Sequence, residues 1–197
     1  MQKRDVLRHV AIVVILSASI SVLLNILLLR IDLPQYSERY QEVSVMLYSP
    51  PFWQQLLTSG LLIPILEELI FRGIGFQLLR RWIAFPWAMA ISAVAFGAYH
   101  GNLVQFVYAG ICGVLLAFLC EKYDSIIAPI ISHMAMNTVA IVFTQWGVFG
   151  EIMKSDIVGM IVMLFCGVCG MAMFRVLQKM DVTKVLKMYC KEQGNDI

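Results

Sequence analysis

The chain has 197 residues, of which 60% are hydrophobic and only 14% are charged, and its mean hydropathy is +0.78. Soluble domains usually carry about 25% charged residues, so this composition excludes a water-soluble globular protein. The formal net charge of +2 is too small to indicate nucleic-acid binding. One integral-membrane domain, residues 1–197, accounts for the whole length and leaves no room for a separate soluble module.

Apolar runs along the chain predict the fold class, an all-α, polytopic bundle of membrane helices. A helix needs about 20 apolar residues to cross the hydrocarbon layer, and about six runs reach or approach that length. The first run is interpreted as an uncleaved helix and not a signal peptide, because Arg30 and Asp32 follow it without a small-residue cleavage site. The predicted membrane helices cover residues 10–29, 52–79, 83–101, 103–121, 125–146 and 156–175.

Basic residues are divided unevenly between the two ends of these helices. Eleven lysines and arginines fall on the side that carries both termini, and three fall on the other side. By the positive-inside rule, this asymmetry predicts cytoplasmic N- and C-termini. The eleven are Lys3, Arg4, Arg8, Arg80, Arg81, Lys122, Arg175, Lys179, Lys184, Lys187 and Lys191, and the three are Arg30, Arg39 and Lys154.

Two segments lie outside the predicted membrane helices. Residues 30–51 are expected to form one sizeable extracytoplasmic loop, polar and containing Tyr36, Tyr40 and Tyr48. Residues 174–191 have the pattern of an amphipathic basic helix that lies against the inner leaflet, where it would orient and anchor the protein.

Two adjacent glutamates, Glu67 and Glu68, lie with Arg72 inside an otherwise apolar stretch. Carboxylates at bilayer depth cost a few kcal/mol each, so a chain that keeps two of them together is expected to use them. Glu68 and Arg72 are four residues apart on one helix face and can form an ion pair, whereas Glu67 points about 100° away and stays free to act. The alternative is that both glutamates belong to a buried structural ion network.

Two further polar groups lie on other predicted helices. His100 ends the third helix, where a lone histidine has the alternative role of an interfacial or capping residue. His133 and Asn137 are four residues apart on the fifth helix and share a face. Taken alone, that pair is equally consistent with a hydrogen-bond clamp between helices.

Together these groups are those needed to split an amide bond with water. Glu67 would take the proton of the water as general base, and a histidine would align that water. Donors from a histidine and from Asn137 would stabilise the developing oxyanion. In the alternative chemistry, Glu67, His100 and His133 would hold a zinc ion with an open position for water.

At these residues the chain resembles the CPBP family, the CAAX-processing and bacteriocin-processing intramembrane endopeptidases. The family motifs EExxxR, FxxxH and HxxxN occur here in order, on three predicted helices within about residues 60–145. They are Glu67-Glu68-x-x-x-Arg72, Phe96-x-x-x-His100 and His133-x-x-x-Asn137.

The resemblance implies a helical bundle with a catalytic cavity sunk below the membrane surface. By that likeness, Glu67 and His100 activate water, and His133 and Asn137 bind the oxyanion. Glu68, Arg72 and Phe96 would form the supporting shell. Metal-free glutamate chemistry without a cofactor is favoured because the cluster has no HExxH motif and no cysteine thiolate, with zinc as the alternative.

The leading functional hypothesis is therefore an intramembrane endopeptidase acting on a peptide or membrane-protein substrate at the cytoplasmic side of a bacterial plasma membrane. The processing would be of the CAAX type or of the bacteriocin and leader-peptide type. A non-catalytic membrane immunity or binding protein with the same bundle is the second hypothesis. A small transporter or proton relay is the third, although the chain lacks the repeats and broken helix pairs expected of one.

The hypothesis requires the three motifs to converge at one depth. With straight helices, His100 falls near the outer end of its helix, whereas His133 lies about 10 Å from the cytoplasmic side at 1.5 Å per residue. Glu67 falls between them on a helix about 42 Å long by the same rise. Gly73 and Gly75 would permit a bend in that helix.

Overall fold

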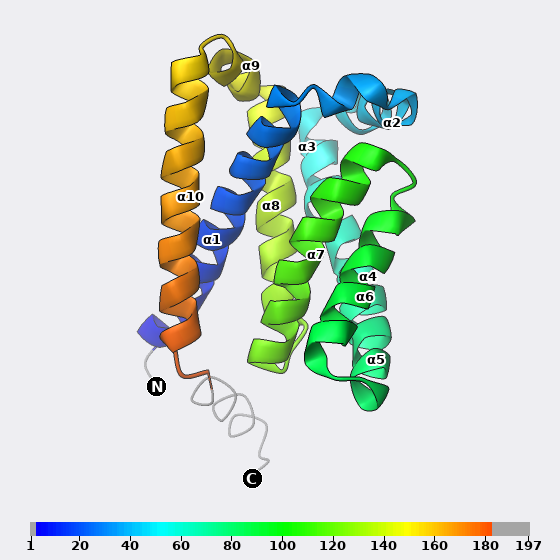
Figure 1. The fold of residues 1–197 in the computed structure, drawn as a ribbon, viewed down its shortest axis with the longest axis vertical. Helices are drawn as coiled ribbons and strands as arrows, with labels where there is room; N and C mark the ends of the chain where they lie inside the picture. Colours follow the sequence, from blue (N-terminus) through cyan, green and yellow to red (C-terminus); the bar gives the residue numbers. More distant parts are fainter. Residues whose placement is uncertain (1–2, 183–197) are drawn as a thin grey trace.

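The computed structural model describes residues 3–182, and within that range every regular element is a helix (Figure 1). This confirms the predicted all-α fold class. The separate helices are α1 (Lys3–Arg30), α2 (Glu38–Tyr48), α6 (Phe85–Tyr99), α7 (Leu103–Tyr123), α8 (Ile127–Gln145), α9 (Val148–Met153) and α10 (Asp156–Lys179). A further helix runs from Phe52 to Trp82 and contains α3 (Phe52–Gln55), α4 (Ile63–Glu68) and α5 (Gln77–Trp82).

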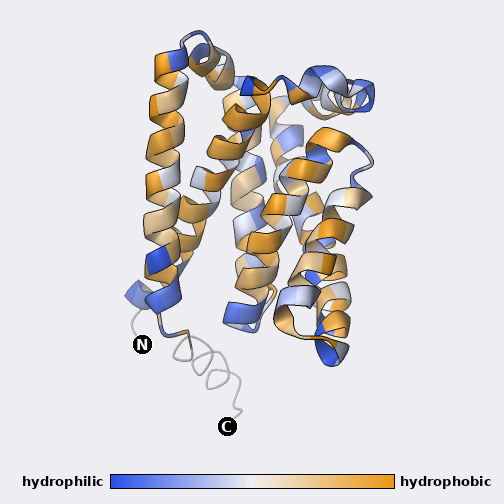
Figure 2. Cartoon of the chain, viewed as in Figure 1, coloured by the Kyte–Doolittle hydropathy of each residue, from blue (hydrophilic) through white to orange (hydrophobic). Residues whose placement is uncertain are grey.

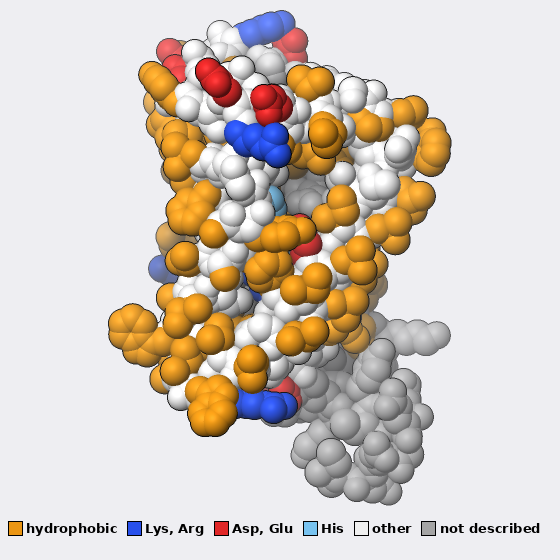
Figure 3. Space-filling model, turned by 90° about the vertical axis from the view of Figure 1, so that its right-hand side faces the viewer, with side chains coloured by type: hydrophobic (Ala, Val, Ile, Leu, Met, Phe, Trp, Pro, Cys, Tyr) orange, Lys and Arg blue, Asp and Glu red, His pale blue; other side chains and the backbone are white. Residues whose placement is uncertain are grey.

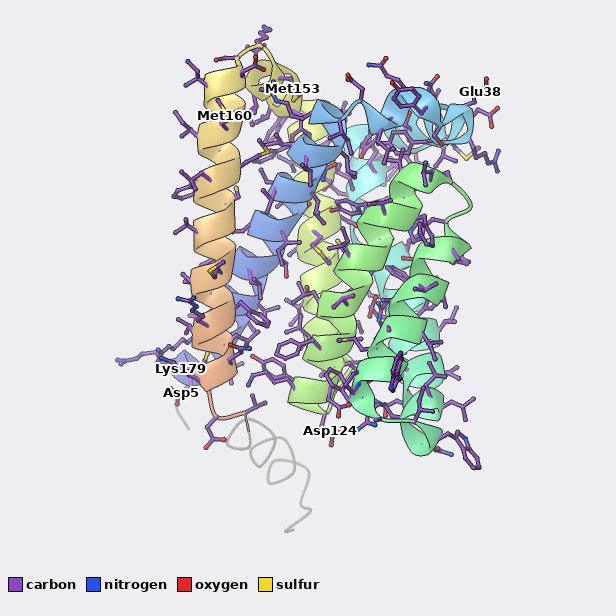
Figure 4. All side chains as sticks on the ribbon, in the orientation of Figure 1. Asp5, Glu38, Asp124, Met153, Met160 and Lys179 are labelled. Atoms are coloured by element: carbon purple, nitrogen blue, oxygen red, sulfur yellow. The ribbon has the colours of Figure 1, made fainter. Side chains whose placement is uncertain are left out.

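The long helices run between two ends of the molecule. The chain enters near the N-terminal end of α1, and α10 returns to that same end (Figure 1). The helices α2 and α9 lie across the opposite end. Glu38 and Met153 mark the α2 and α9 end, and Asp5, Asp124 and Lys179 mark the other (Figure 4).

Most residues along the long helices are hydrophobic, and hydrophilic residues gather mainly at the two ends of the bundle (Figure 2). Leu164 and Phe165 on α10 are 69% and 70% exposed, as expected for side chains that face lipid. The protein is therefore an integral membrane protein. Four helices are long and apolar enough to cross a membrane, namely Arg4–Arg30, Leu103–Tyr123, Ile127–Gln145 and Asp156–Lys179.

Helices occupy all six predicted ranges, but α6 is shorter than a full span and the Phe52–Trp82 helix is interrupted. Six crossings and cytoplasmic termini therefore remain predictions. The expected loop 30–51 contains the helix α2, preceded by a short 3₁₀ turn at Leu33–Tyr36. Of the tail helix predicted for 174–191, α10 supplies the part up to Lys179, Met180–Val182 are not helical, and the remainder lies outside the described residues.

The Phe52–Trp82 helix carries two segments of wide, π-type turns. The first, Leu56–Leu62, precedes Pro64. Proline has no N–H, and its ring clashes with the carbonyl four residues earlier, which here belongs to Gly60 inside the wide segment. The local distortion thus accommodates a proline that would otherwise break the helix.

The second wide segment, Leu69–Phe76, contains both Gly73 and Gly75, where the sequence permitted a bend. The short stretch α4 lies between the two segments and carries Glu67 and Glu68. Wide turns inside α-helices occur frequently at functional sites. In this protein they bracket the acidic pair.

The short helix α6 explains how the motifs reach one depth. It has 15 residues, so its length is about 22 Å at 1.5 Å per residue, against about 30 Å for the hydrocarbon layer. The turn that follows lies below the level of α2 (Figure 1). Gly101 adopts a φ of 69° there, and Asn102 begins α7 by accepting a hydrogen bond from the Gln105 N–H at 2.9 Å. His100 therefore lies within the bundle and not at its outer surface.

Helices α6 and α7 approach closely through glycines. A Cβ atom on Gly97 would lie 2.6 Å from the carbonyl oxygen of Phe106, and one on Gly113 would lie 3.0 Å from Cα of Ala93. Small residues allow membrane helices to pack backbone to backbone. This contact holds the helix that carries His100 against the rest of the bundle.

The first helix, α1, is tied to α8 by hydrogen bonds inside the bundle. The hydroxyls of Ser17 and Ser132 lie 2.7 Å apart, and Ser21 donates to the carbonyl oxygen of Met136 at 3.0 Å. Ser132 and Met136 directly precede His133 and Asn137 in the chain. Thus α1 fixes the rotation of the helix that presents these two side chains.

The glycine contact between α6 and α7 gives a stability prediction. Gly97→Ala should destabilise the protein by about 1–3 kcal/mol, because the added methyl group overpacks against a backbone carbonyl that cannot move away. Thermal unfolding in detergent micelles measures the change. The matched control is Gly167→Ala on α10, where a Cβ meets nothing within 4 Å. Equal melting temperatures for the two variants would show that the contact does not constrain the fold.

Candidate active site

A fully buried ion pair lies at the centre of the site. Nη1 of Arg72 donates to Oε1 of Glu68 at 2.8 Å, and both side chains are 0% exposed. Nη2 of Arg72 donates to the carbonyl oxygen of Gly113 at 3.2 Å, and the guanidinium stacks 4.4 Å from the centre of the Phe96 ring. The predicted pairing four residues apart is therefore present, and Arg72 also joins the Phe52–Trp82 helix to α6 and α7.

His133 connects this ion pair to the second glutamate. Its Nδ1 lies 3.0 Å from Oε1 of Glu68, and its Nε2 lies 3.6 Å from Oε2 of Glu67. With Nδ1–H donating to Glu68, the imidazole is held in one orientation with Nε2 toward Glu67. Glu67 itself is directed away from Arg72, as its helical position predicted, and is 8% exposed.

His100 is oriented by its own helix. Its Nδ1 lies 2.9 Å from the carbonyl oxygen of Phe96, one turn earlier. Because a backbone carbonyl only accepts, Nδ1 carries the proton and Nε2 is left as an acceptor. The Phe96 ring is almost perpendicular to both imidazoles, with ring centres 5.1 Å from His100 and 5.5 Å from His133. This buried ring sets the spacing between the two histidines.

Asn137 lies one helical turn beyond His133. Its Nδ2 donates to the carbonyl oxygen of Ser59 at 2.9 Å, on the first wide segment of the neighbouring helix. The amide thus forms the interhelical bond that the clamp hypothesis predicted. Its NH₂ group has two N–H donors, so one such bond does not exhaust it.

The four predicted catalytic side chains line a single cavity of about 910 Å³. They come from α4 (Glu67), the end of α6 (His100) and α8 (His133 and Asn137). The molecular surface is hollowed on the side that carries α2 and α6, and a histidine and an acidic side chain are visible there (Figure 3). The short α6 and the interrupted helix together bring the three motifs to one depth.

The cavity lies in the half of the molecule that carries α2 and α9. Its walls include Leu28 and Leu29 at the end of α1, Thr144 near the end of α8, and Gly150 on α9. The opposite end, where α1 begins and α10 ends, contributes no lining residue among residues 3–182. Sequence reasoning missed the contribution of α2, although its apolar residues recur at helical spacing.

A preformed metal site is not evident at this position. Within residues 3–182, no group of three or more histidine, cysteine, aspartate or glutamate side chains is arranged to hold an ion. Glu67 and His133 approach each other, and the Nδ1 contact of His100 to the Phe96 carbonyl leaves its Nε2 as an acceptor. The zinc alternative stays a prediction.

Residues 49–139 match the family described as "Type II CAAX prenyl endopeptidase Rce1-like". All three motifs fall within the matched range. The resemblance to the CPBP family is confirmed. The chain is also 34% identical over 106 residues to "Putative membrane peptidase YdiL" of Bacillus subtilis (strain 168), a match that covers 54% of this chain and 43% of the relative. The matched segment thus spans less than half of that relative's length, and no solved structure matches the chain significantly.

The buried ion pair gives a second stability prediction. Arg72→Met removes the guanidinium that pairs with the buried Glu68 carboxylate, so the free energy of unfolding should fall by about 3–5 kcal/mol. Denaturant unfolding in detergent measures the loss. Arg39→Met is the matched control, because Arg39 pairs with Glu42 at 3.0 Å on the exposed face of α2, where such pairs contribute at most about 1 kcal/mol. Similar losses in both variants would contradict the structural role assigned to Arg72.

Proposed function

We propose that the protein is an intramembrane endopeptidase that hydrolyses a peptide bond with a water activated by Glu67. The observation that carries this proposal is the shared cavity. A carboxylate, two imidazoles and an amide from three helices line it within a core that matches a peptidase family.

In the proposed reaction, water binds between Glu67 and Nε2 of His100. Glu67 accepts a proton from the water as general base, and the hydroxide oxygen attacks the carbonyl carbon of the substrate. The acceptor lone pair on Nε2 of His100 holds the second water proton and so orients the nucleophile. The proton then passes from Glu67 to the leaving nitrogen when the C–N bond breaks.

The oxyanion formed by this attack would be bound by His133 and Asn137. The Nδ1–H group of His133 already donates to Glu68. For Nε2 to donate to the oxyanion as well, the ring must carry a proton on both nitrogens, and its positive charge then lies between Glu68 and Glu67. The second N–H of the Asn137 amide supplies the other donor. Preorganised donors in a water-poor cavity stabilise developing negative charge more than they would in bulk water.

The substrate class follows from the family and from the position of the cavity. A peptide or membrane-protein substrate processed in the CAAX or leader-peptide manner is consistent with the family description. The cavity lies at the α2 and α9 end, away from both ends of the described chain. If the termini are cytoplasmic, as the basic residues predict, this position favours cleavage toward the outer side and not at the cytoplasmic side.

Substitution of the proposed catalytic residues tests the function. Glu67→Gln, His100→Ala and His133→Ala should each lower the rate of peptide cleavage at least about 100-fold, the usual contribution of general acid–base catalysis. The assay uses purified protein and a library of quenched-fluorescence peptides. Glu151→Gln, on the exposed α9 surface, is the control and should cleave at the wild-type rate.

The immunity or binding hypothesis predicts a different result from the same variants. In that case wild type and variants alike would cleave nothing in the library, while partner binding would survive each substitution. Far-UV circular dichroism of each variant establishes that its helices are intact.

Treatment with a metal chelator distinguishes metal-free hydrolysis from zinc-dependent hydrolysis. Wild-type activity should be unchanged after incubation with EDTA or 1,10-phenanthroline, because Glu67 supplies the base without a metal. The measurement compares the initial cleavage rate of the untreated protein with the rate after the chelator has been added and removed. Loss of activity that added zinc restores would establish the metal-dependent alternative.

A further inference from the structure

Helix α2 turns one stripe of side chains into the cavity. Tyr40, Val43, Ser44, Leu47 and Tyr48 recur at the three- and four-residue spacing of a helix face, and all five line the cavity. All five are half-buried. An amphipathic helix normally buries such a stripe against a core, whereas here the stripe borders open space.

The opposite face of α2 is fully outside the cavity. Val45 and Met46 are 68% and 74% exposed, and the charged residues of the helix, Glu38, Arg39 and Glu42, are exposed with them. The cavity-facing stripe therefore carries no acidic or basic side chain. Burial raises the pKa of Tyr40 to about 12 and also raises that of Tyr48, so both phenols stay neutral at physiological pH.

The position of α2 is fixed relative to the acidic pair. The buried Gln55 side chain donates to the carbonyl oxygens of Tyr48 at 3.1 Å and Pro50 at 2.7 Å. Gln55 belongs to the same Phe52–Trp82 helix that presents Glu67. At the other end, Ser37 caps α2 by accepting from the Tyr40 N–H at 3.3 Å. The Phe52–Trp82 helix thus connects the stripe to the proposed general base.

We propose that the α2 stripe is a specificity-determining wall that binds a bulky apolar side chain of the substrate next to the scissile bond. This inference rests on the proposed function. It is supported by continuity, since one cavity contains both the stripe and Glu67. The cavity volume of about 910 Å³ also lies at the upper end of the range of roughly 300–1,000 Å³ typical of sites that enclose an organic ligand.

The uncharged side chains of the α2 stripe favour an apolar side chain of the substrate. An uncharged surface of aliphatic and phenolic groups gains by burying an apolar side chain and rejects an unpaired charge. The α2 stripe lies outside the range of residues 49–139 that matches the family.

The first test places a bulkier side chain on the α2 stripe. The kcat/KM of wild type, Leu47→Trp and Met46→Trp is measured on quenched-fluorescence peptides that carry Gly, Ala, Leu, Phe or Asp at each position beside the scissile bond. Wild type should prefer Leu or Phe at one position. Leu47→Trp should lower kcat/KM for those peptides by on the order of tenfold or more relative to the Gly and Ala peptides. Met46→Trp, on the exposed face of α2, should keep the wild-type profile.

These outcomes separate the two proposals. If Glu67 is required for cleavage but Leu47→Trp and Met46→Trp give the same side-chain profile, the specificity wall is wrong and the peptidase stands. If no peptide is cleaved, or if Glu67→Gln cleaves as wild type does, the proposed function itself fails.

A second test does not depend on turnover. A photoreactive benzoylphenylalanine replaces Leu47 or Met46 in the Glu67→Gln full chain, which is reconstituted in phosphatidylcholine and phosphatidylglycerol vesicles with the preferred peptide. Mass spectrometry of the cross-linked protein should show peptide at position 47 and none at position 46. Lipid adducts at position 47 that added peptide does not displace would assign the cavity to an acyl chain and overturn the proposal.

Discussion

The bond between Glu68 and Arg72 is the interaction on which the rest of the site depends. Both side chains are fully buried, and a charge at that depth is tolerated only when its partner and further hydrogen bonds compensate the loss of water. The partners of Arg72 and Glu68 are spread over three neighbouring helices: Gly113 on α7, the Phe96 ring on α6 and His133 on α8. The requirement to compensate the charges of one buried ion pair therefore determines how four helices pack together.

This arrangement also assigns different tasks to two neighbouring glutamates. Glu68 is held by Arg72 and His133 through one carboxylate oxygen. Glu67, one residue earlier, turns to the cavity and approaches only the far nitrogen of the same imidazole. The charged centre thereby supports His133, and the second carboxylate lines the cavity.

Local features were predictable from the sequence because they depend on short spacings. The helical ranges, the pairing of Glu68 with Arg72 and the separate direction of Glu67 all follow from hydropathy and from 3.6 residues per turn. The contact between Glu68 and His133 joins residues 65 positions apart, and no periodicity reports it. The same holds for the bond from Asn137 to Ser59, which depends on how α8 packs against the first wide segment. Helix α2 was missed for another reason, since its apolar stripe is short and lies in a segment whose polar residues suggested a loop.

The shortness of α6 has a consequence for the surrounding lipid. Trp87 and Tyr99, near the two ends of this helix, are 69% and 65% exposed, and such residues prefer the headgroup level. Membranes adapt to a short hydrophobic stretch by becoming thinner around it. The bilayer beside α6 is therefore expected to dip toward the histidine that follows Tyr99, which shortens the path from the aqueous phase for the water that the proposed hydrolysis consumes.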